Sequence, residues 1–382
     1  MRNKLAVNYH LIPEVIRQEL VAPHQLRLGP MTSGGLSGAS IWHCQSPRGP
    51  VALRAWPADH PTPERLRHIH KAMGSARQRG LRSIPAVYDN RHGKSFTSDG
   101  QRLWELTQWM PGMANYHQAP TSQKLQSALR AVAKLHVAWH TGDNSTAQDQ
   151  WLNCSSQDAT RVAQSDGLSE ANLAGPAVGW SPTVAERRQK LELSLQRLQA
   201  WRIHSGGGVY GSSSACGSIL ADPLLSTAAV RGLAHLTLVH LAVRGPALLK
   251  ELIEIQPIPV RLHFVLRDVW SDHILFTEDR VTGIIDFGAA RVDEPATDVA
   301  RLLGSLEPFD ASRWLIGWQA YYAENPHVDV ERVRLLDRVG TLLAAVQWLQ
   351  WLVIEPRQFA VPIEQLLLRW QRPLQRLEAS AT

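Results

Sequence analysis

Three side chains between residues 260 and 288 have the types and the spacing for acid–base and metal chemistry. Asp268 follows a short apolar run, and His273 precedes a predicted β-hairpin whose second strand ends at Asp286. Because a hairpin brings its two ends together, we expect these side chains to converge on one edge. One carboxylate can accept a proton from a hydroxyl there, while the other and the imidazole hold a divalent cation.

The elements that must position these residues change in type along the chain. Residues 26–107 contain short apolar runs separated by turn residues, which predict strands, and one helix that begins at Thr62 as the N-cap. Beyond residue 112 the pattern is mostly helical, and the polar, Gly- and Ser-rich stretches at 141–183 and 204–218 predict surface loops. The predicted fold class is α+β.

The composition is that of a globular protein. The chain has 382 residues, of which 44% are hydrophobic and 19% charged, so it can bury a large core without disulfides. Cys44, Cys154 and Cys216 lie far apart without Cys-x-x-Cys spacing, which argues against a disulfide framework or structural zinc and favours a reducing compartment.

Charge and hydropathy limit the partners. The net charge is +6, but the basic residues are dispersed, so a pI of about 9.4 is the only argument for a nucleic-acid-binding protein, and we expect no nucleic-acid partner. The first residues lack an apolar signal core, and the apolar stretch Leu342–Ile354 is shorter than the ~20 residues that span a bilayer. We expect a cytoplasmic protein without a membrane partner.

The motif block resembles the catalytic and metal motifs of the protein-kinase-like superfamily. His273 follows Asp268 after four residues, and the triplet Asp286-Phe287-Gly288 begins eighteen positions after Asp268. With the continuation Pro295–Leu303, this block is most similar to the aminoglycoside phosphotransferase (choline-kinase-like) family. Only residues 142–255 or so lack any similarity to it.

The resemblance implies a two-lobed protein-kinase-like fold, with a small β-rich N-terminal lobe and a larger, mostly helical C-terminal lobe. The nucleotide-binding lobe would span residues 1–108, the catalytic and acceptor-binding lobe 109–382, and the hinge about 105–112. The implied activity is ATP-dependent transfer of the γ-phosphate to a hydroxyl of a small molecule, with ATP and Mg²⁺ as cofactors.

The same resemblance implies roles for individual residues. Asp268 would orient and deprotonate the acceptor hydroxyl, while Asp286 and His273 would bind the metal. The loop that covers the phosphates would consist of Ser33, Gly34, Gly35, Ser37 and Gly38. Arg54 would pair with the α- and β-phosphates, with Glu64 as its helical partner, and Glu105 and Thr107 would belong to the hinge that recognises adenine.

Three positions depart from the family pattern. Leu266 stands where a histidine is usual, His273 replaces the metal-binding asparagine, and Arg54 replaces the strand lysine. Arginine keeps the charge but presents it in a planar fork, and imidazole is a softer ligand than Mg²⁺ prefers, so Mn²⁺ is a further expected metal. These departures leave a second hypothesis open: a pseudokinase that acts as a nucleotide-binding or protein-interaction module.

Overall fold

The computed structural model describes residues 11–34, 38–140, 177–204, 228–359 and 361–379. The chain forms two compact units. The first unit comprises Met1–Pro176, His263–Val292 and Ile316–Pro326, and the second comprises Ala177–Leu262, Asp293–Leu315 and His327–Thr382. The predicted α+β class is confirmed, since the first unit holds a six-stranded sheet and the second is mostly helical. The lobe bounds 1–108 and 109–382 stay a prediction.

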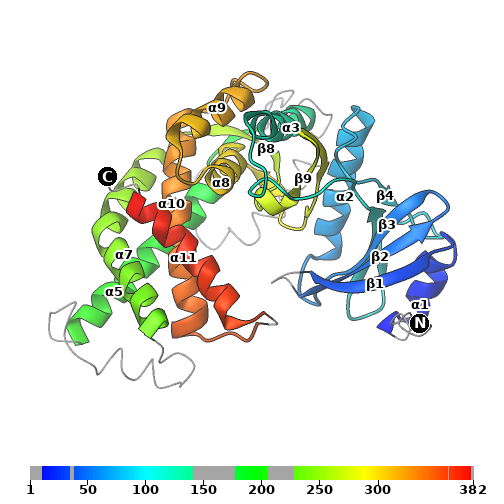
Figure 1. The fold of residues 1–382 in the computed structure, drawn as a ribbon, viewed down its shortest axis with the longest axis horizontal. Coiled ribbons are helices and arrows are strands. Elements are labelled where there is room, and N and C mark those ends of the chain that lie inside the picture. The colour runs from blue at the N-terminus through cyan, green and yellow to red at the C-terminus, as the bar shows by residue number, and fades with distance from the viewer. Residues whose placement is uncertain (1–10, 35–37, 141–176, 205–227, 360, 380–382) are drawn as a thin grey trace, which may run out of the picture. The chain divides into compact units, whose positions relative to one another are not determined.

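The large sheet has the order β1-β2-β3-β6-β4, and β5 pairs with β6 (Figure 1). Its strands are β1 (Arg27–Gly34), β2 (Ala39–Ser46), β3 (Gly49–Ala55), β4 (Val87–Tyr88), β5 (Thr97–Ser98) and β6 (Leu103–Gln108). All of the pairings are antiparallel. The predicted succession of short strands is therefore one continuous sheet.

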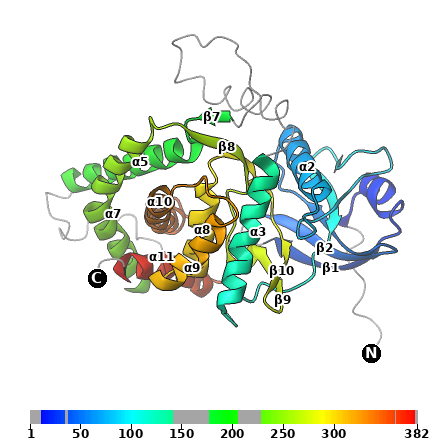
Figure 2. The ribbon, with the colours of Figure 1, turned by 90° about the horizontal axis from the view of Figure 1, so that it is seen from above.

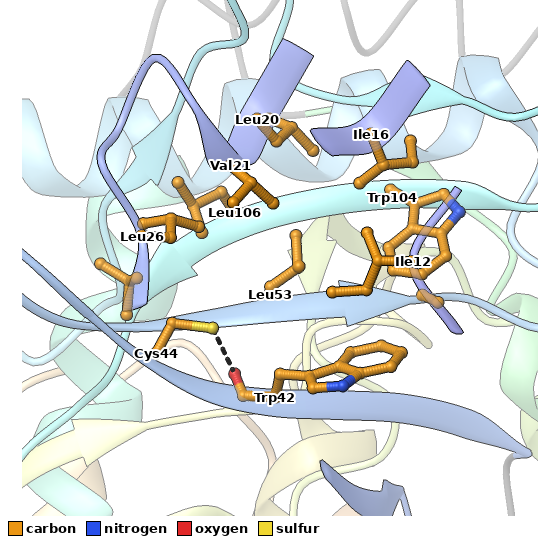
Figure 3. Close-up of a cluster of buried hydrophobic side chains, with 12 residues drawn as sticks. Ile12, Ile16, Leu20, Val21, Leu26, Trp42, Cys44, Leu53, Trp104 and Leu106 are labelled. Atoms are coloured by element: carbon orange, nitrogen blue, oxygen red, sulfur yellow. Dashed lines mark hydrogen bonds between the residues drawn. The ribbon is translucent and has the colours of Figure 1, made fainter. Parts of the chain in front are cut away.

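One face of this sheet is an apolar core. Leu53 pairs with Trp42 on one side and Leu106 on the other, so these side chains share a face. They pack against apolar residues of α1 (Glu14–Ile16) and the π-helical turn η2 (Arg17–Val21), as Figure 3 shows. The same alternation places Arg54 and its neighbour Glu105 on the opposite face.

Helix α2 (Pro63–Gln78) begins as its sequence predicts. The Thr62 hydroxyl accepts a hydrogen bond from the Arg65 amide, and Pro63 occupies the first turn, where a missing amide hydrogen costs nothing. Leu66 and Ile69 lie on its buried face. The helix is joined to α3 (Ser122–His140) by a hydrogen bond from Trp139 Nε1 to the Ala72 carbonyl, 2.9 Å long.

The predicted hairpin consists of β9 (Ile274–Thr277) and β10 (Arg280–Ile284), and α3 packs along β10 (Figure 2). The segment after β6 is joined to it by two backbone hydrogen bonds between Met113 and Phe276, each 2.9 Å long. A Cβ at Gly112 would lie only 2.7 Å from the Phe276 carbonyl, and the φ of this residue is +98°, so the close approach requires glycine.

The second unit is built around α10 (Val330–Leu349). This helix packs against α5 (Pro182–His204), α7 (Ala228–Ile255), α8 (Ala296–Leu306) and α11 (Ile363–Ala379). Most of the two predicted loops lies outside the described residues. The prediction of a loop up to residue 183 is wrong at its end, because residues 177–179 form β7 and α5 begins at Pro182. Strand β7 is paired with β8 (Val260–Val265), a partner distant in sequence.

Among the helices described, α7 is long and apolar enough, by length and composition alone, to cross a membrane. Core helices of soluble proteins also meet this criterion, although only 33% of the apolar window of α7 is buried. Its contacts within the second unit are with α5, α10 and α11. The expected absence of a membrane segment therefore stays a prediction.

Candidate active site

At the mouth of the β9–β10 hairpin, His273 contacts the backbone of Asp268 and faces the side chain of Asp286. His273 Nδ1 is 2.7 Å from the backbone carbonyl of Asp268, and His273 Nε2 is 3.7 Å from Asp286 Oδ2. The backbone closes the mouth, since the Ile285 amide donates to the His273 carbonyl over 3.0 Å. The expected convergence is thus present for the side chains of His273 and Asp286, and the backbone carbonyl of Asp268 joins them.

The hydrogen bonds of His273 fix its tautomer. The indole Nε1–H of Trp270 donates to His273 Nε2 over 2.9 Å, so Nε2 carries a lone pair. Nδ1 then carries the proton and donates it to the Asp268 carbonyl. The lone pair of the ring nitrogen that faces Asp286 is engaged by the Trp270 indole in this structure, so a metal could bind Nε2 only if that hydrogen bond were given up.

The backbone is strained at Asp286 and at Arg267, the residue before Asp268. Asp286 has a φ of 62°, and Arg267, directly before Asp268, has a φ of 65°. Residues other than glycine seldom adopt these left-handed values, and where they do they cluster at functional sites. Phe287 anchors the second turn, because its buried ring packs edge-on against Trp139 with centroids 6.2 Å apart.

Arg54 reaches the same cluster from β3. Its Nη1 is 3.4 Å from Asp286 Oδ1, and its guanidinium carbon lies 4.7 Å from the ring centroid of Trp56. A Cβ at Gly288 would come within 2.8 Å of the Trp56 ring, so the glycine of the motif gives this indole its room. Arg54, which is predicted to bind phosphates, therefore contacts Asp286, the predicted metal ligand.

The carboxylate partner of Arg54 within the sheet is Glu105, and this corrects one expectation. Arg54 Nε lies 3.6 Å from Glu105 Oε1, across the β3–β6 pairing. Glu64, which we expected as the partner, is exposed in the first turn of α2. A cross-strand pair thus takes the place of a strand–helix pair.

Glu105 also binds a residue that the sequence analysis missed. His70 Nε2 on α2 is 2.6 Å from Glu105 Oε2, and both side chains are buried. Burial raises the pKa of Glu105, but the hydrogen bond and charge of His70, with the charge of Arg54, hold it below its ordinary value. The sequence feature that could have indicated this contact is the polar His70 on the buried face of the helix, one turn after Leu66.

Glu105 and Thr107 were expected in the adenine-binding hinge, and both belong to β6. The Glu105 side chain takes part instead in the network with Arg54 and His70. Thr107 pairs with Ala52 on one side and Val87 on the other, inside the sheet. These strand positions neither support nor exclude a contact with adenine, so the hinge role of the two residues stays a prediction.

The predicted phosphate loop is the connection between β1 and β2. Ser33 and Gly34 pair with Ser40 and Ala39, respectively. Gly38 has a φ of +73°, which favours glycine. The remaining predicted residues of the loop, Gly35 and Ser37, lie outside the described residues.

The donor set suits a metal that takes few protein ligands. Within the described parts of the chain, no group of three or more His, Cys, Asp and Glu side chains is placed to hold a metal ion. His273 and Asp286 offer one nitrogen and one carboxylate at a spacing of 3.7 Å. Mg²⁺ is usually held by one or two carboxylates together with phosphate oxygens and water, so Asp286 fits this role, whereas the imidazole of His273 is a softer ligand.

The comparisons agree with this fold. A model of the phosphotransferase enzyme family matches residues 216–355, which include the whole motif block. A spectinomycin phosphotransferase solved with ADP and spectinomycin is 12% identical, covers 97% of this chain and 98% of its own, and has a TM-score of 0.57. No curated protein matches the chain in sequence.

Two further structures have the same fold. An aminoglycoside phosphotransferase from Alicyclobacillus acidocaldarius is 15% identical over 96% of this chain and 93% of its own, with a TM-score of 0.53. An amicoumacin kinase solved with AMP-PNP and Ca²⁺ is 11% identical over 92% and 88%, also with 0.53. The predicted protein-kinase-like fold and the resemblance to the phosphotransferase family are confirmed.

Proposed function

We propose that this protein is an ATP-dependent phosphotransferase that transfers the γ-phosphate to a hydroxyl group of a small molecule. The observation that carries this proposal is the cluster at the hairpin mouth. There Arg54 and His273 lie 3.4 and 3.7 Å from the two carboxylate oxygens of Asp286. A cation, a carboxylate and an imidazole at one point suit the binding of a metal–nucleotide.

Each residue of the cluster has one task. Asp286 and His273 would hold Mg²⁺, or Mn²⁺, which would neutralise charge on the nucleotide phosphates. Arg54 binds phosphate oxygens, and its guanidinium is kept in place by Glu105 and the Trp56 ring. The β1–β2 connection covers the phosphates with backbone amides.

Asp268 acts on the acceptor. Its carboxylate accepts the proton of the acceptor hydroxyl as the oxygen of that hydroxyl forms a bond to the γ-phosphorus. The bond from the γ-phosphorus to the bridging oxygen breaks, and ADP leaves with the electron pair. The backbone of Asp268 is held by His273, so this base and the metal site have a fixed relation.

The acceptor is a small molecule with a hydroxyl, of the aminoglycoside, choline, amino alcohol or sugar class. Spectinomycin and amicoumacin, on which the relatives act by name, belong in the first panel of acceptors. The basic net charge of this chain weighs against a polycationic acceptor. We also propose a cytoplasmic location.

The test is ATP consumption over a panel of amino sugars, small alcohols and choline-like compounds. We expect turnover with at least one acceptor, and stabilisation by Mg·ATP of about 2.7 kcal/mol at a hundred times its Kd. Stabilisation without turnover on any acceptor would favour the pseudokinase hypothesis. No stabilisation by either Mg·ATP or Mg·GTP would overturn the nucleotide site itself.

A further inference from the structure

The first unit contains an open cavity of about 410 Å³ that the proposed reaction does not use. It lies beside α2 and β4, and its lining includes Arg67, Lys71, Gly74, Arg77, Val87 and Asp89. The volume lies within the usual range for small-molecule sites, roughly 300–1,000 Å³. The question is which class of ligand these side chains suit.

The charged side chains of the lining are mostly positive. Arg67, Lys71 and Arg77 stand on the same helix, and Asp89 supplies the only carboxylate of the lining. None of the three cations forms a salt bridge within the described residues. Arg77 is held by the Ile84 carbonyl and by Gln108, both uncharged, and burial with the nearby charge of Arg82 lowers its pKa. A net positive, preformed lining favours an anion.

Gly74 gives an independent indication. It lies in the middle of α2, where glycine costs about 1 kcal/mol relative to alanine. A Cβ built at Gly74 meets no atom within 4 Å, and its backbone is helical, so neither packing nor conformation requires glycine there. Because glycine has no side chain, it leaves the cavity open. This accounts for a glycine at a position where close packing does not require one.

The remaining lining consists of apolar residues, the polar Ser95, and His70, which is connected to the candidate active site. Ala86 and Val87 contribute an apolar wall. His70 also lines the cavity; its Nε2 binds Glu105, while its buried Nδ1 has no hydrogen-bond partner in the part of the chain described. A ligand here therefore meets both charge and apolar surface.

We propose that the cavity between α2 and β4 binds a small organic anion, in which a phosphate or carboxylate group is attached to an apolar body. The anionic group pairs with Arg67 and Lys71, and the apolar body fills the space above Gly74 and beside Val87. This site is separate from the hairpin mouth and does not depend on the proposed phosphoryl transfer.

The test is a calorimetric titration of the full chain with 1-naphthyl phosphate, compared with 1-naphthol and inorganic phosphate. We expect the naphthyl phosphate to bind at least about tenfold more tightly than either comparator, because only it offers both charge and apolar surface. Gly74→Leu places a side chain in the cavity at a position where a Cβ meets no atom within 4 Å, and it favours the helix, so it should abolish binding while unfolding no earlier than the wild type.

Three further variants locate the binding. The double variant Arg67→Gln/Lys71→Gln should weaken binding about tenfold or more. Lys250→Gln, an exposed change on α7, and Asp286→Asn at the hairpin mouth should leave it unchanged. Binding that survives Gly74→Leu, or that is lost in Asp286→Asn, would place the anion elsewhere and overturn the proposal, as would no binding at millimolar concentration.

Discussion

Arg54 Nη1 and Asp286 Oδ1 lie 3.4 Å apart, although 232 positions separate the two residues in the chain. The contact connects the central strand β3 with the turn after β10. Since the Asp286 side chain is 40% exposed, the ion pair itself adds little to stability. In the proposed reaction both partners bind the metal–nucleotide.

Replacing Asp286 by Asn should therefore remove metal-dependent nucleotide binding and leave the fold intact. We expect calorimetry to show no Mg·ATP binding at concentrations that saturate the wild type, and a free energy of unfolding within about 1 kcal/mol of it. The matched control is Asp272→Asn, an exposed carboxylate close in sequence. Wild-type Mg·ATP affinity in Asp286→Asn would exclude this residue as the metal ligand.

Glu105 should matter for stability far more than Glu64. Glu105→Gln removes the charge that faces both Arg54 and His70 in a buried site, so we expect a loss of about 1–3 kcal/mol in urea unfolding. Glu64→Gln, on the exposed first turn of α2, should change it by less than about 0.5 kcal/mol. Equal effects of the two changes would contradict the assignment of Glu105 as the partner of Arg54.

Local signals explain what the sequence predicted correctly. The start of α2 is encoded by Thr62 and Pro63 side by side, and the β9–β10 hairpin by two short apolar runs around a polar turn. Such features depend on neighbours within a few residues. The convergence of His273 with Asp286 followed because a hairpin closes its own mouth.

What the sequence did not predict depends on distant partners. The pairing of Arg54 with Glu105 depends on the register of β3 against β6. The two residues are about fifty positions apart in the chain, and no local pattern sets the register between strands so far apart. The sequence shows only that His70 lies on one face of a helix. Its role depends on Glu105 of β6, a partner that the sequence does not place beside it. Residues 177–179 form a strand only because β8 lies beside them.

Acid should destabilise the protein through His263. This buried ring lies 5.3 Å from His136 and 5.8 Å from His140 by centroids, and burial, with the charge of His136, lowers its pKa to about 3. Between that value and the unfolded pKa near 6.5 only the unfolded chain takes up the proton. This histidine therefore makes stability rise with pH across that interval.

We expect the free energy of unfolding to fall by about 2 kcal/mol between pH 6.5 and 5 on account of His263. Urea unfolding at pH 7, 6 and 5 measures the slope for the wild type and for His263→Gln, which lacks the titrating ring. A variant with the same pH slope as the wild type would show that His263 does not carry the effect.

The thiol of Cys44 should be unreactive in the folded protein. Cys44 is buried in the apolar core of Figure 3, and burial raises its pKa to about 11, so almost no thiolate exists at pH 8. We expect mass spectrometry to find the Cys44 peptide unmodified by iodoacetamide until urea unfolds the chain. Rapid labelling without denaturant would contradict the packing of this core.

The most direct test of the proposed function is phosphate transfer by Asp268→Asn. With an acceptor found in the panel, we predict that turnover falls about 10²–10⁴-fold while Mg·ATP affinity stays within about twofold of the wild type, since this residue acts on the acceptor hydroxyl. Asp272→Asn should keep wild-type turnover. Undiminished turnover in Asp268→Asn would contradict the role of the hairpin mouth as a catalytic site.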